Sequence, residues 1–317
     1  MPLSDSKSSP SSPQRRGFLQ TITAAAVGGA LAMKATAAPT NRPRLGIVVG
    51  VSGKETPDAA IARVHRFGLP TCQVSVGQAP PSLAGPLKAA LDKYGVEATA
   101  AMTLGGGPMV WDFYHGPKTI GLVPRSTRAA RIAALKRASD LAKQCGIGAV
   151  HTHCGFIPED PNDPMYPETV KTIHEIASYC KNNGQLFLME TGQETPITML
   201  RVIEDVGLDN LSANLDTANL ILYGKGEPVG AMDVIGKHVR GLHAKDGLYP
   251  TDPKQLGKEV AIGKGRVDFP ELIRRLRKLN YTGPITIERE ISGPEQESDI
   301  RASVSFLNKL IKQSYGS

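Results

Sequence analysis

Three short stretches decide the fold of this chain: LFLMETGQET at residues 186–195, LSANLDTANL at residues 211–220 and VRGLHAKDG at residues 239–247. In each stretch an apolar run leads to a side chain that can bind a metal, namely Glu190, Asp216 and His243. These side chains lie 26 and 27 positions apart. One strand, one helix and two loops need roughly 25 to 35 residues. Each candidate ligand therefore arrives one β/α unit after the last, at the same end of a parallel sheet.

The same alternation continues in both directions along the chain. Apolar runs typical of buried parallel strands occur also at residues 44–51, 71–77, 96–106, 149–156 and 284–290. Helix-forming segments follow the strands at residues 57–67, 81–94, 125–145, 168–183, 196–206, 228–238 and 298–312. One further helix is expected to begin after Asp268. Eight such units predict a closed (β/α)₈ TIM barrel over residues 43–314, as a single domain rather than an open doubly wound sheet.

Composition and charge are those of an ordinary globular domain. The 317 residues are 40% hydrophobic and 21% charged. The formal charge of +7 falls to a mild positive excess once the first 37 residues are set aside, and no segment is dense in Lys or Arg. We therefore expect no nucleic-acid partner.

The first 37 residues predict a twin-arginine signal peptide. Arg15 and Arg16 precede an apolar run at residues 18–32, and Ala35-Thr36-Ala37 offers small residues for cleavage. The run is too short and too rich in Gly and Ala for a membrane span. A retained signal anchor or a disordered tail is the alternative. We predict a periplasmic or secreted protein, exported by the twin-arginine route and not stably associated with the membrane after cleavage.

The chain has four cysteines, Cys72, Cys145, Cys154 and Cys180, without a Cys-x-x-Cys pair. This spacing does not fit a zinc ribbon. In an oxidising compartment Cys145 and Cys180 could form a disulfide, because both are predicted at the ends of neighbouring helices. Buried free thiols are the interpretation we prefer.

A fourth candidate ligand, Glu288, stands near the end of PITIERE at residues 284–290. A carboxylate at the end of a buried strand needs a partner or a metal. Strand side chains alternate between faces, so Glu190 shares a face with Leu188, and His243 with Gly241 and Val239. Glu290 has the same parity as Glu288, which we prefer because it is nearer to the barrel. Three carboxylates and one imidazole suit Mn²⁺, Mg²⁺, Co²⁺ or Zn²⁺.

The motifs ETGQET, NLDTANLILYG, HAKD and ITIERE resemble those of the xylose isomerase-like TIM barrels, a superfamily of sugar phosphate isomerases and epimerases. It includes ketose 3-epimerases, inosose dehydratases and the endonuclease IV type of AP endonuclease. The resemblance covers residues 43–311 and implies that Glu190, Asp216, His243 and Glu288 hold one divalent metal, with Mn²⁺ expected first. It also implies that Glu190 and Glu288 are the catalytic acid/base pair. The ketose 3-epimerase branch usually has a His three residues after the metal Asp, where this chain has Asn219.

Other substrate-binding candidates surround this set. His153 shares the inward face of its predicted strand with His151, which we interpret as an interior histidine. Lys245 could reach either a substrate oxyanion or a carboxylate at the rim. The remaining candidates are Gln193, Glu194, Asn219 and Trp111, the last on an aromatic loop that could close over a sugar or pack on itself. The glycines at residues 105–107 and 263–265 lack phosphate-loop spacing, so we expect no nucleotide cofactor.

These expectations describe a metal-dependent sugar isomerase or epimerase that moves a proton next to a carbonyl through an enediolate. A dehydratase or lyase on a 3-keto sugar or inosose is the first alternative, and a sugar-binding barrel without catalysis is the second. An exported protein would meet unphosphorylated sugars. The chain has only seven histidines, and its sequence indicates no basic face for DNA. Both observations argue against a function in DNA repair. We expect a small sugar or keto sugar as the ligand. The sequence leaves open whether the protein forms a homo-oligomer.

Overall fold

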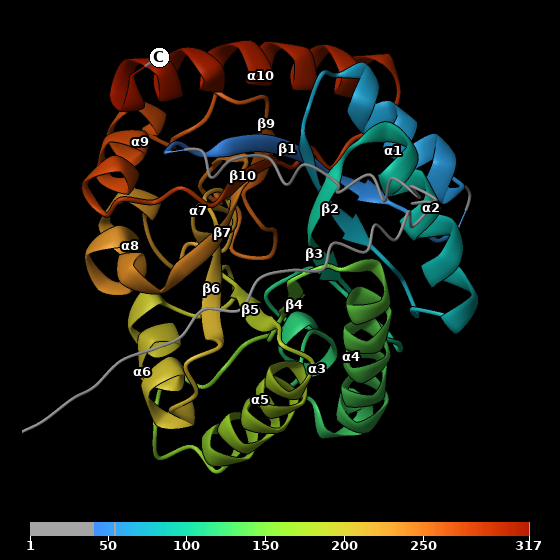
Figure 1. Cartoon of the computed structure of the whole chain (residues 1–317). Coiled ribbons are helices and arrows are strands. Elements are labelled where there is room, and N and C mark those ends of the chain that lie inside the picture. Colours follow the sequence, from blue (N-terminus) through green and yellow to red (C-terminus); the bar gives the residue numbers. More distant parts are fainter. Residues whose placement is uncertain (1–40, 54, 317) are drawn as a thin grey trace, which may run out of the picture. The chain divides into compact units, whose positions relative to one another are not determined.

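A computed structural model describes residues 41–53 and 55–316 of the chain. Within these residues eight parallel strands close into a barrel in the order β1-β10-β7-β6-β5-β4-β3-β2. Figure 1 shows the strands grouped at the centre with helices around them. The predicted (β/α)₈ fold is confirmed. The predicted signal peptide lies outside the described residues.

The barrel strands are short and their connections carry the helices. The strands are β1 (Arg44–Gly50), β2 (Thr71–Ser75), β3 (Glu97–Met102), β4 (Ala149–His153), β5 (Leu186–Glu190), β6 (Leu211–Asp216), β7 (Val239–Ala244) and β10 (Pro284–Ile287). The helices are α1 (Pro57–Arg66), η1 (Pro81–Leu83), α2 (Ala84–Tyr94), α3 (Gly116–Thr119), α4 (Arg125–Cys145), α5 (Met165–Asn182), α6 (Pro196–Val206), α7 (Asn219–Leu222), α8 (Pro228–Ile235), η2 (Gly236–His238), α9 (Phe269–Lys278) and α10 (Pro294–Tyr315).

Local signals account for most helix boundaries. The helix predicted at residues 196–206 has these bounds because Thr195 caps its start by accepting from Thr198 N, and because Gly207 ends it with φ 65°. The helix at residues 125–145 also matches its prediction and ends at a left-handed Gly146. Residues 228–238 differ from their prediction, since α8 ends at Ile235 and continues as the 3₁₀ turn η2.

Side-chain alternation separates an outer from an inner face of the barrel. On β5, Phe187 and Met189 join the main core with the helices, whereas Leu188 packs in a separate small cluster with Ala100 and Ala149. Glu190 follows Leu188 on this inner face, as predicted. Val239 was expected on the face of His243 but belongs to the main core. The alternation fails there because the register of β7 against β6 shifts between Ala213 and Asn214.

The loop from β7 to α9 is folded by a buried carboxylate that local patterns did not reveal. It contains the antiparallel strands β8 (Asp246–Leu248) and β9 (Lys258–Val260). Asp246, 1% exposed, accepts from four backbone N–H groups of the loop at 2.9 to 3.1 Å, those of Gly247, Gly263, Gly265 and Val267. The Asp of HAKD therefore fixes the loop that follows His243.

The loop from β3 to α4 is fixed in a similar way by a cation. Arg131 is 1% exposed and donates to four loop carbonyls, those of Gly106, Pro108, Thr119 and Gly121, at 2.6 to 3.2 Å. This loop carries Trp111.

Two sequence predictions concern cysteines and membranes. The four cysteines, all among the described residues, are free thiols; Cys145 is half-buried and the other three are buried. The disulfide between Cys145 and Cys180 is therefore not formed. No helix in residues 41–53 and 55–316 is long and apolar enough to cross a membrane.

Candidate metal centre and substrate pocket

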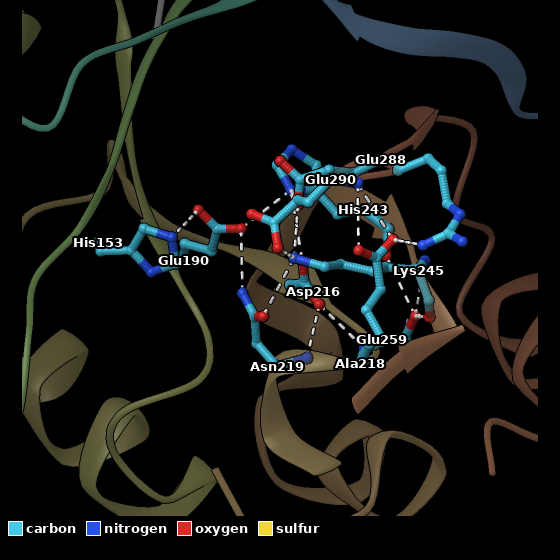
Figure 2. Close-up of polar contacts among 12 residues, drawn as sticks. His153, Glu190, Asp216, Ala218, Asn219, His243, Lys245, Glu259, Glu288 and Glu290 are labelled. Atoms are coloured by element: carbon cyan, nitrogen blue, oxygen red, sulfur yellow. Dashed lines mark hydrogen bonds and ion pairs between the residues drawn. The ribbon is translucent and has the colours of Figure 1, made fainter. Parts of the chain in front are cut away.

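The four predicted ligands converge at the C-terminal end of the barrel. One ligand atom from each of Glu190, Asp216, His243 and Glu288 lies within 4.8 Å of the others. His243 Nδ1 is at the centre of the set: it lies 2.9 Å from Glu190 Oε1, 3.4 Å from Glu288 Oε2 and 3.6 Å from Asp216 Oδ2. Figure 2 shows these side chains pointing toward one another.

Strand register explains this convergence. Glu190 and Asp216 are the last residues of β5 and β6, and Glu288 follows directly on β10. His243 pairs with Asp216 on one side and with Thr286 of β10 on the other. The ligands therefore lie at or just beyond the C-terminal ends of four neighbouring strands of a closed sheet.

Burial makes the charges of this set strongly interdependent. Burial disfavours the imidazolium of His243, but Glu288 and Glu190 outweigh it and raise the pKa of His243 well above its ordinary value. Burial raises the pKa of Asp216 to about 6, although Lys245 opposes the shift. Burial would also raise the pKa of Glu190, yet the nearby imidazoles lower it. Three buried carboxylates around one imidazole need positive charge close by.

The donor set fits a divalent ion. Asp216 Oδ2 is buried and has no hydrogen-bond partner among the described residues. Asp216 Oδ1, in contrast, accepts from Ala218 N at 2.9 Å and Asn219 N at 2.7 Å, which leaves Oδ2 for the centre. Hard carboxylate oxygens with one imidazole suit Mn²⁺, Mg²⁺, Co²⁺ or Zn²⁺.

Two further histidines hold the outer oxygen of Glu190. His151 Nε2 and His153 Nε2 lie 3.0 and 2.9 Å from Glu190 Oε2. His153 Nδ1 lies 3.3 Å from Gln193 Oε1, so Gln193 orients His153 from outside the pocket. The predicted interior His151 is fully buried and also stacks edge-on against His243, at 5.1 Å between ring centres.

Lys245 lies beside the ligands rather than at the rim. Its Nζ is 2.9 Å from Glu290 Oε2, 3.2 Å from Glu288 Oε2 and 3.9 Å from Asp216 Oδ2. Burial opposes its charge, but these carboxylates raise its pKa well above the ordinary value. It also donates to Asn219 Oδ1 at 3.4 Å, while Asn219 Nδ2 donates to Glu190 at 3.5 Å.

A cavity of 260 Å³ opens above the ligands. Its polar lining residues are His153, Asn219, Glu288 and Glu290, and its apolar or aromatic ones are Met102, Leu104, Trp111, Leu222, Tyr223 and Leu256. Trp111 packs edge-on against His153 with ring centres 5.1 Å apart. The pocket is just below the usual range of about 300–1,000 Å³, so it suits a small polar ligand with one apolar face.

Glu194, predicted to bind substrate, lies outside this cavity. It is 1% exposed, and no other described residue donates a hydrogen bond to its carboxylate. Burial raises its pKa from 4.5 to about 8. Because the folded state then binds a proton more tightly than the unfolded chain, the stabilisation by protonated Glu194 is complete below pH 4.5 and is lost as the pH rises to about 8.

Replacing Glu194 by Gln is therefore expected to remove a pH dependence of stability. Unfolding free energies from urea titrations should be similar for both proteins at pH 5. At pH 8.5 the Gln variant should be the more stable, because Glu194 weakens the wild type by up to ~1.4 kcal/mol per pH unit across that window. Parallel pH profiles for the two proteins would contradict this prediction.

Several residues at the site carried no local signal. Gln73 reaches His243 from β2, and Tyr223 lines the pocket from the residue after α7. Glu290 shares the inward parity of Glu288 but pairs with Lys245 and is 58% exposed. Only the alternation of buried polar residues within β2, TCQVS, could have singled out Gln73.

Fold and site together define a parallel (β/α)₈ barrel with a buried centre of three carboxylates and a histidine, the kind of centre that holds a divalent metal. The chain belongs to the family of xylose isomerase-like TIM barrels, whose family model matches residues 61–310.

Solved structures share this fold, and sequence relatives match parts of the chain. The crystal structure of a xylose isomerase domain protein from Planctomyces limnophilus is 33% identical, with a TM-score of 0.79 over 87% of this chain and 100% of that one. A crystal structure of D-psicose 3-epimerase in the presence of D-fructose shares the fold at 17% identity, with a TM-score of 0.63 over 86% and 100% of the two chains. An uncharacterised protein of Methanocaldococcus jannaschii is 24% identical over 174 residues, which span 51% of this chain and 58% of that protein.

Proposed function

We propose that this protein is a divalent-metal-dependent sugar epimerase or isomerase. The observation that carries the proposal is the convergence within 4.8 Å of four ligand atoms, from three buried residues and the half-buried Glu288, at the base of a sugar-sized pocket. Membership of a family whose fold is shared by D-psicose 3-epimerase supports it. The alternative of a sugar-binding barrel without catalysis gives no reason for three carboxylates to be buried together.

The two glutamates are placed to move a proton. A divalent ion bound here would polarise a carbonyl and lower the cost of forming an enediolate. Glu288 lines the pocket, whereas Glu190 lies beneath it with Oε2 held by His151 and His153. One glutamate takes the proton from the carbon next to the carbonyl, and the electron pair of the broken C–H bond forms the enediolate. The other glutamate returns a proton to the opposite face or to the neighbouring carbon.

Lys245 completes this arrangement. Its ammonium group is held among Glu288, Glu290 and Asn219 at the base of the pocket. We infer that it offsets negative charge on the substrate oxygen as the enediolate forms. In the ketose 3-epimerase branch a histidine usually stands in the sequence position of Asn219. Here Asn219 is neutral, and it accepts a hydrogen bond from the ammonium group of Lys245 at 3.4 Å.

The pocket favours an unphosphorylated substrate. None of the described residues that line it is Arg or Lys, and two of them, Glu288 and Glu290, are acidic. Lys245 is already paired with carboxylates. A phosphate dianion would meet these two carboxylates with no Arg or Lys among the lining residues to bind it, which is costly in a partly buried site.

Solvent exchange tests the proposed chemistry. The protein, stripped of metal and reloaded with Mn²⁺, would be incubated in D₂O with a panel of free ketoses, 3-keto sugars and their phosphates, and deuterium uptake followed by NMR. We expect metal-dependent deuteration next to the carbonyl of at least one free sugar, with an epimer or isomer as product. Loss of water from the substrate would identify a dehydratase instead. Metal binding without exchange across the panel would contradict the proposed function.

Trp111 is expected to contribute to substrate binding more than to turnover. Its ring borders the pocket beside His153, and aromatic packing on a sugar face is worth about 0.5–1.5 kcal/mol, so Trp111→Ala should raise KM roughly 3- to 10-fold with little change in kcat. Tyr114→Ala on the same loop is the matched control, because Tyr114 is exposed and does not line the pocket. Equal KM changes in both variants would point to the loop as a whole.

A further inference from the structure

We propose that Gln73 is a positioning residue that makes His243 bind the metal through Nδ1, and that Asn214 holds Gln73 in the required orientation. This inference rests on the metal centre of the proposed function. It concerns two buried amides that do not touch the substrate pocket.

The contacts form a chain across the barrel interior. His243 Nε2 lies 2.8 Å from Gln73 Oε1, and Gln73 Nε2 donates to Asn214 Oδ1 at 3.2 Å. The three side chains are at most 1% exposed, so water does not compete for these groups. They come from β7, β6 and β2: β6 and β7 are neighbouring strands, and closure of the barrel brings β2 to them across the interior.

The polarity of the amides determines which imidazole nitrogen carries the proton. An amide has one donating and one accepting end. In the structure Asn214 turns Oδ1, which can only accept, toward the NH₂ end of Gln73, and Gln73 Oε1 then faces His243. Oε1 can only accept in turn, so His243 must keep its proton on Nε2. The lone pair of the neutral ring is then on Nδ1, the nitrogen that lies 2.9 Å from Glu190 and 3.4 Å from Glu288.

The opposite orientation would disable the ligand. If the NH₂ end of Gln73 faced His243, Nε2 would have to accept and the neutral ring would carry its proton on Nδ1. That proton would point into the ligand set, where the lone pair is needed. Histidine ligands of metals are generally oriented by an acceptor on the other ring nitrogen, and loss of such a partner typically costs about 10- to 100-fold in metal affinity.

The backbone is locally adapted to this amide pair. The register of β2 on β3 shifts between Cys72 and Gln73, and that of β6 on β7 shifts between Ala213 and Asn214. Such irregularities redirect side chains beside functional sites. Gly241 provides the remaining space, since a Cβ at this position would collide with Asn214 Oδ1. Two register shifts and one glycine thus act on the same two amides.

Metal affinity tests the proposal independently of turnover. Mn²⁺ binding by the full chain would be measured by competition with a fluorescent chelator. Gln73→Met keeps the length of the side chain without an acceptor and is expected to weaken binding about 10- to 100-fold, whereas Gln73→Glu keeps an acceptor and should stay within about threefold of the wild type. Asn214→Asp should likewise stay near the wild type, and Asn214→Leu should weaken binding.

A measurement on the unmodified protein covers the case in which a variant does not fold. With ¹⁵N-labelled histidine and bound Mg²⁺, side-chain NMR should show one of the seven histidines with a protonated Nε2 and a metal-shifted Nδ1. Wild-type affinity in Gln73→Met, equal losses in the Met and Glu variants, or a metal-bound Nε2 would each overturn the role of Gln73. Gln73-dependent binding without substrate exchange would overturn the proposed function alone. No Mn²⁺ binding by the wild type would overturn both.

Discussion

Replacing Glu190 by Gln is expected to remove most of the bound metal and to lower proton exchange by at least about 10²–10⁴-fold. Glu190 Oε1 lies 2.9 Å from His243 Nδ1, and Oε2 lies within 3.0 Å of the two imidazoles of His151 and His153. An amide must place its NH₂ group on one of these sides. It would therefore either lose a ligand oxygen or oppose the imidazole donors, and it could not accept the substrate proton.

Metal per chain by mass spectrometry and deuterium uptake by NMR measure this effect. Glu194→Gln is the matched control, because Glu194 lies four positions further along, is sealed from the pocket and is expected to leave both readouts unchanged. A second pair of variants extends the test. Glu288→Gln should behave like Glu190→Gln. Glu290→Gln removes an exposed partner of Lys245 and should lower proton exchange by less than about tenfold. Full exchange by the Glu190 variant would rule out its role as acid or base.

Replacing Arg131 by Met is expected to lower the free energy of unfolding by on the order of 3 kcal/mol. The guanidinium is buried and donates to four carbonyls of the loop between β3 and α4. Met fills a similar volume but donates nothing, so these carbonyls would need water or a rearranged loop. Each charged hydrogen bond is worth about 1.5–3 kcal/mol, of which relaxation of the loop recovers part.

Urea unfolding at neutral pH measures this loss, and the melting temperature should fall by about 2–4 °C for each kcal/mol. Arg137→Met on the same helix is the control: Arg137 is exposed and makes one bond to a backbone carbonyl, so its loss should stay within about 0.5 kcal/mol. Because the loop carries Trp111, the Arg131 variant should also show a raised KM. A stability equal to that of the control would show that the loop holds its shape without Arg131.

The barrel and its four ligands were predictable because both depend on local pattern. Strands buried on both faces read as apolar runs, and the helices between them begin and end with ordinary caps, as the bounds of α4 and α6 show. A carboxylate or histidine at the end of such a run is conspicuous, and parallel strands bring these ends together. Glu190, Asp216 and His243 were singled out as candidate ligands in this way, and the structure brings them together with Glu288.

The partners of these ligands were not predictable in the same way. Gln73 and Asn214 lie 141 positions apart, and the alternation on β6 and β7 is interrupted by a register shift. The parity of Glu288 and Glu290 is identical, and only the closed barrel places the first among the ligands and the second against Lys245.

The sequence by itself determined three things: the order of the strands along the chain, the end of the barrel that carries the site, and the residues that could hold a metal. These follow from hydrophobic periodicity and chain direction, which can be recognised within a few residues. Tertiary structure alone decided which atoms face the centre. Burial of Asp246, Arg131 and Gln73 forces each to satisfy its polar groups with whatever the closed barrel brings near. Those partners are set by contacts between distant segments, which no local pattern records.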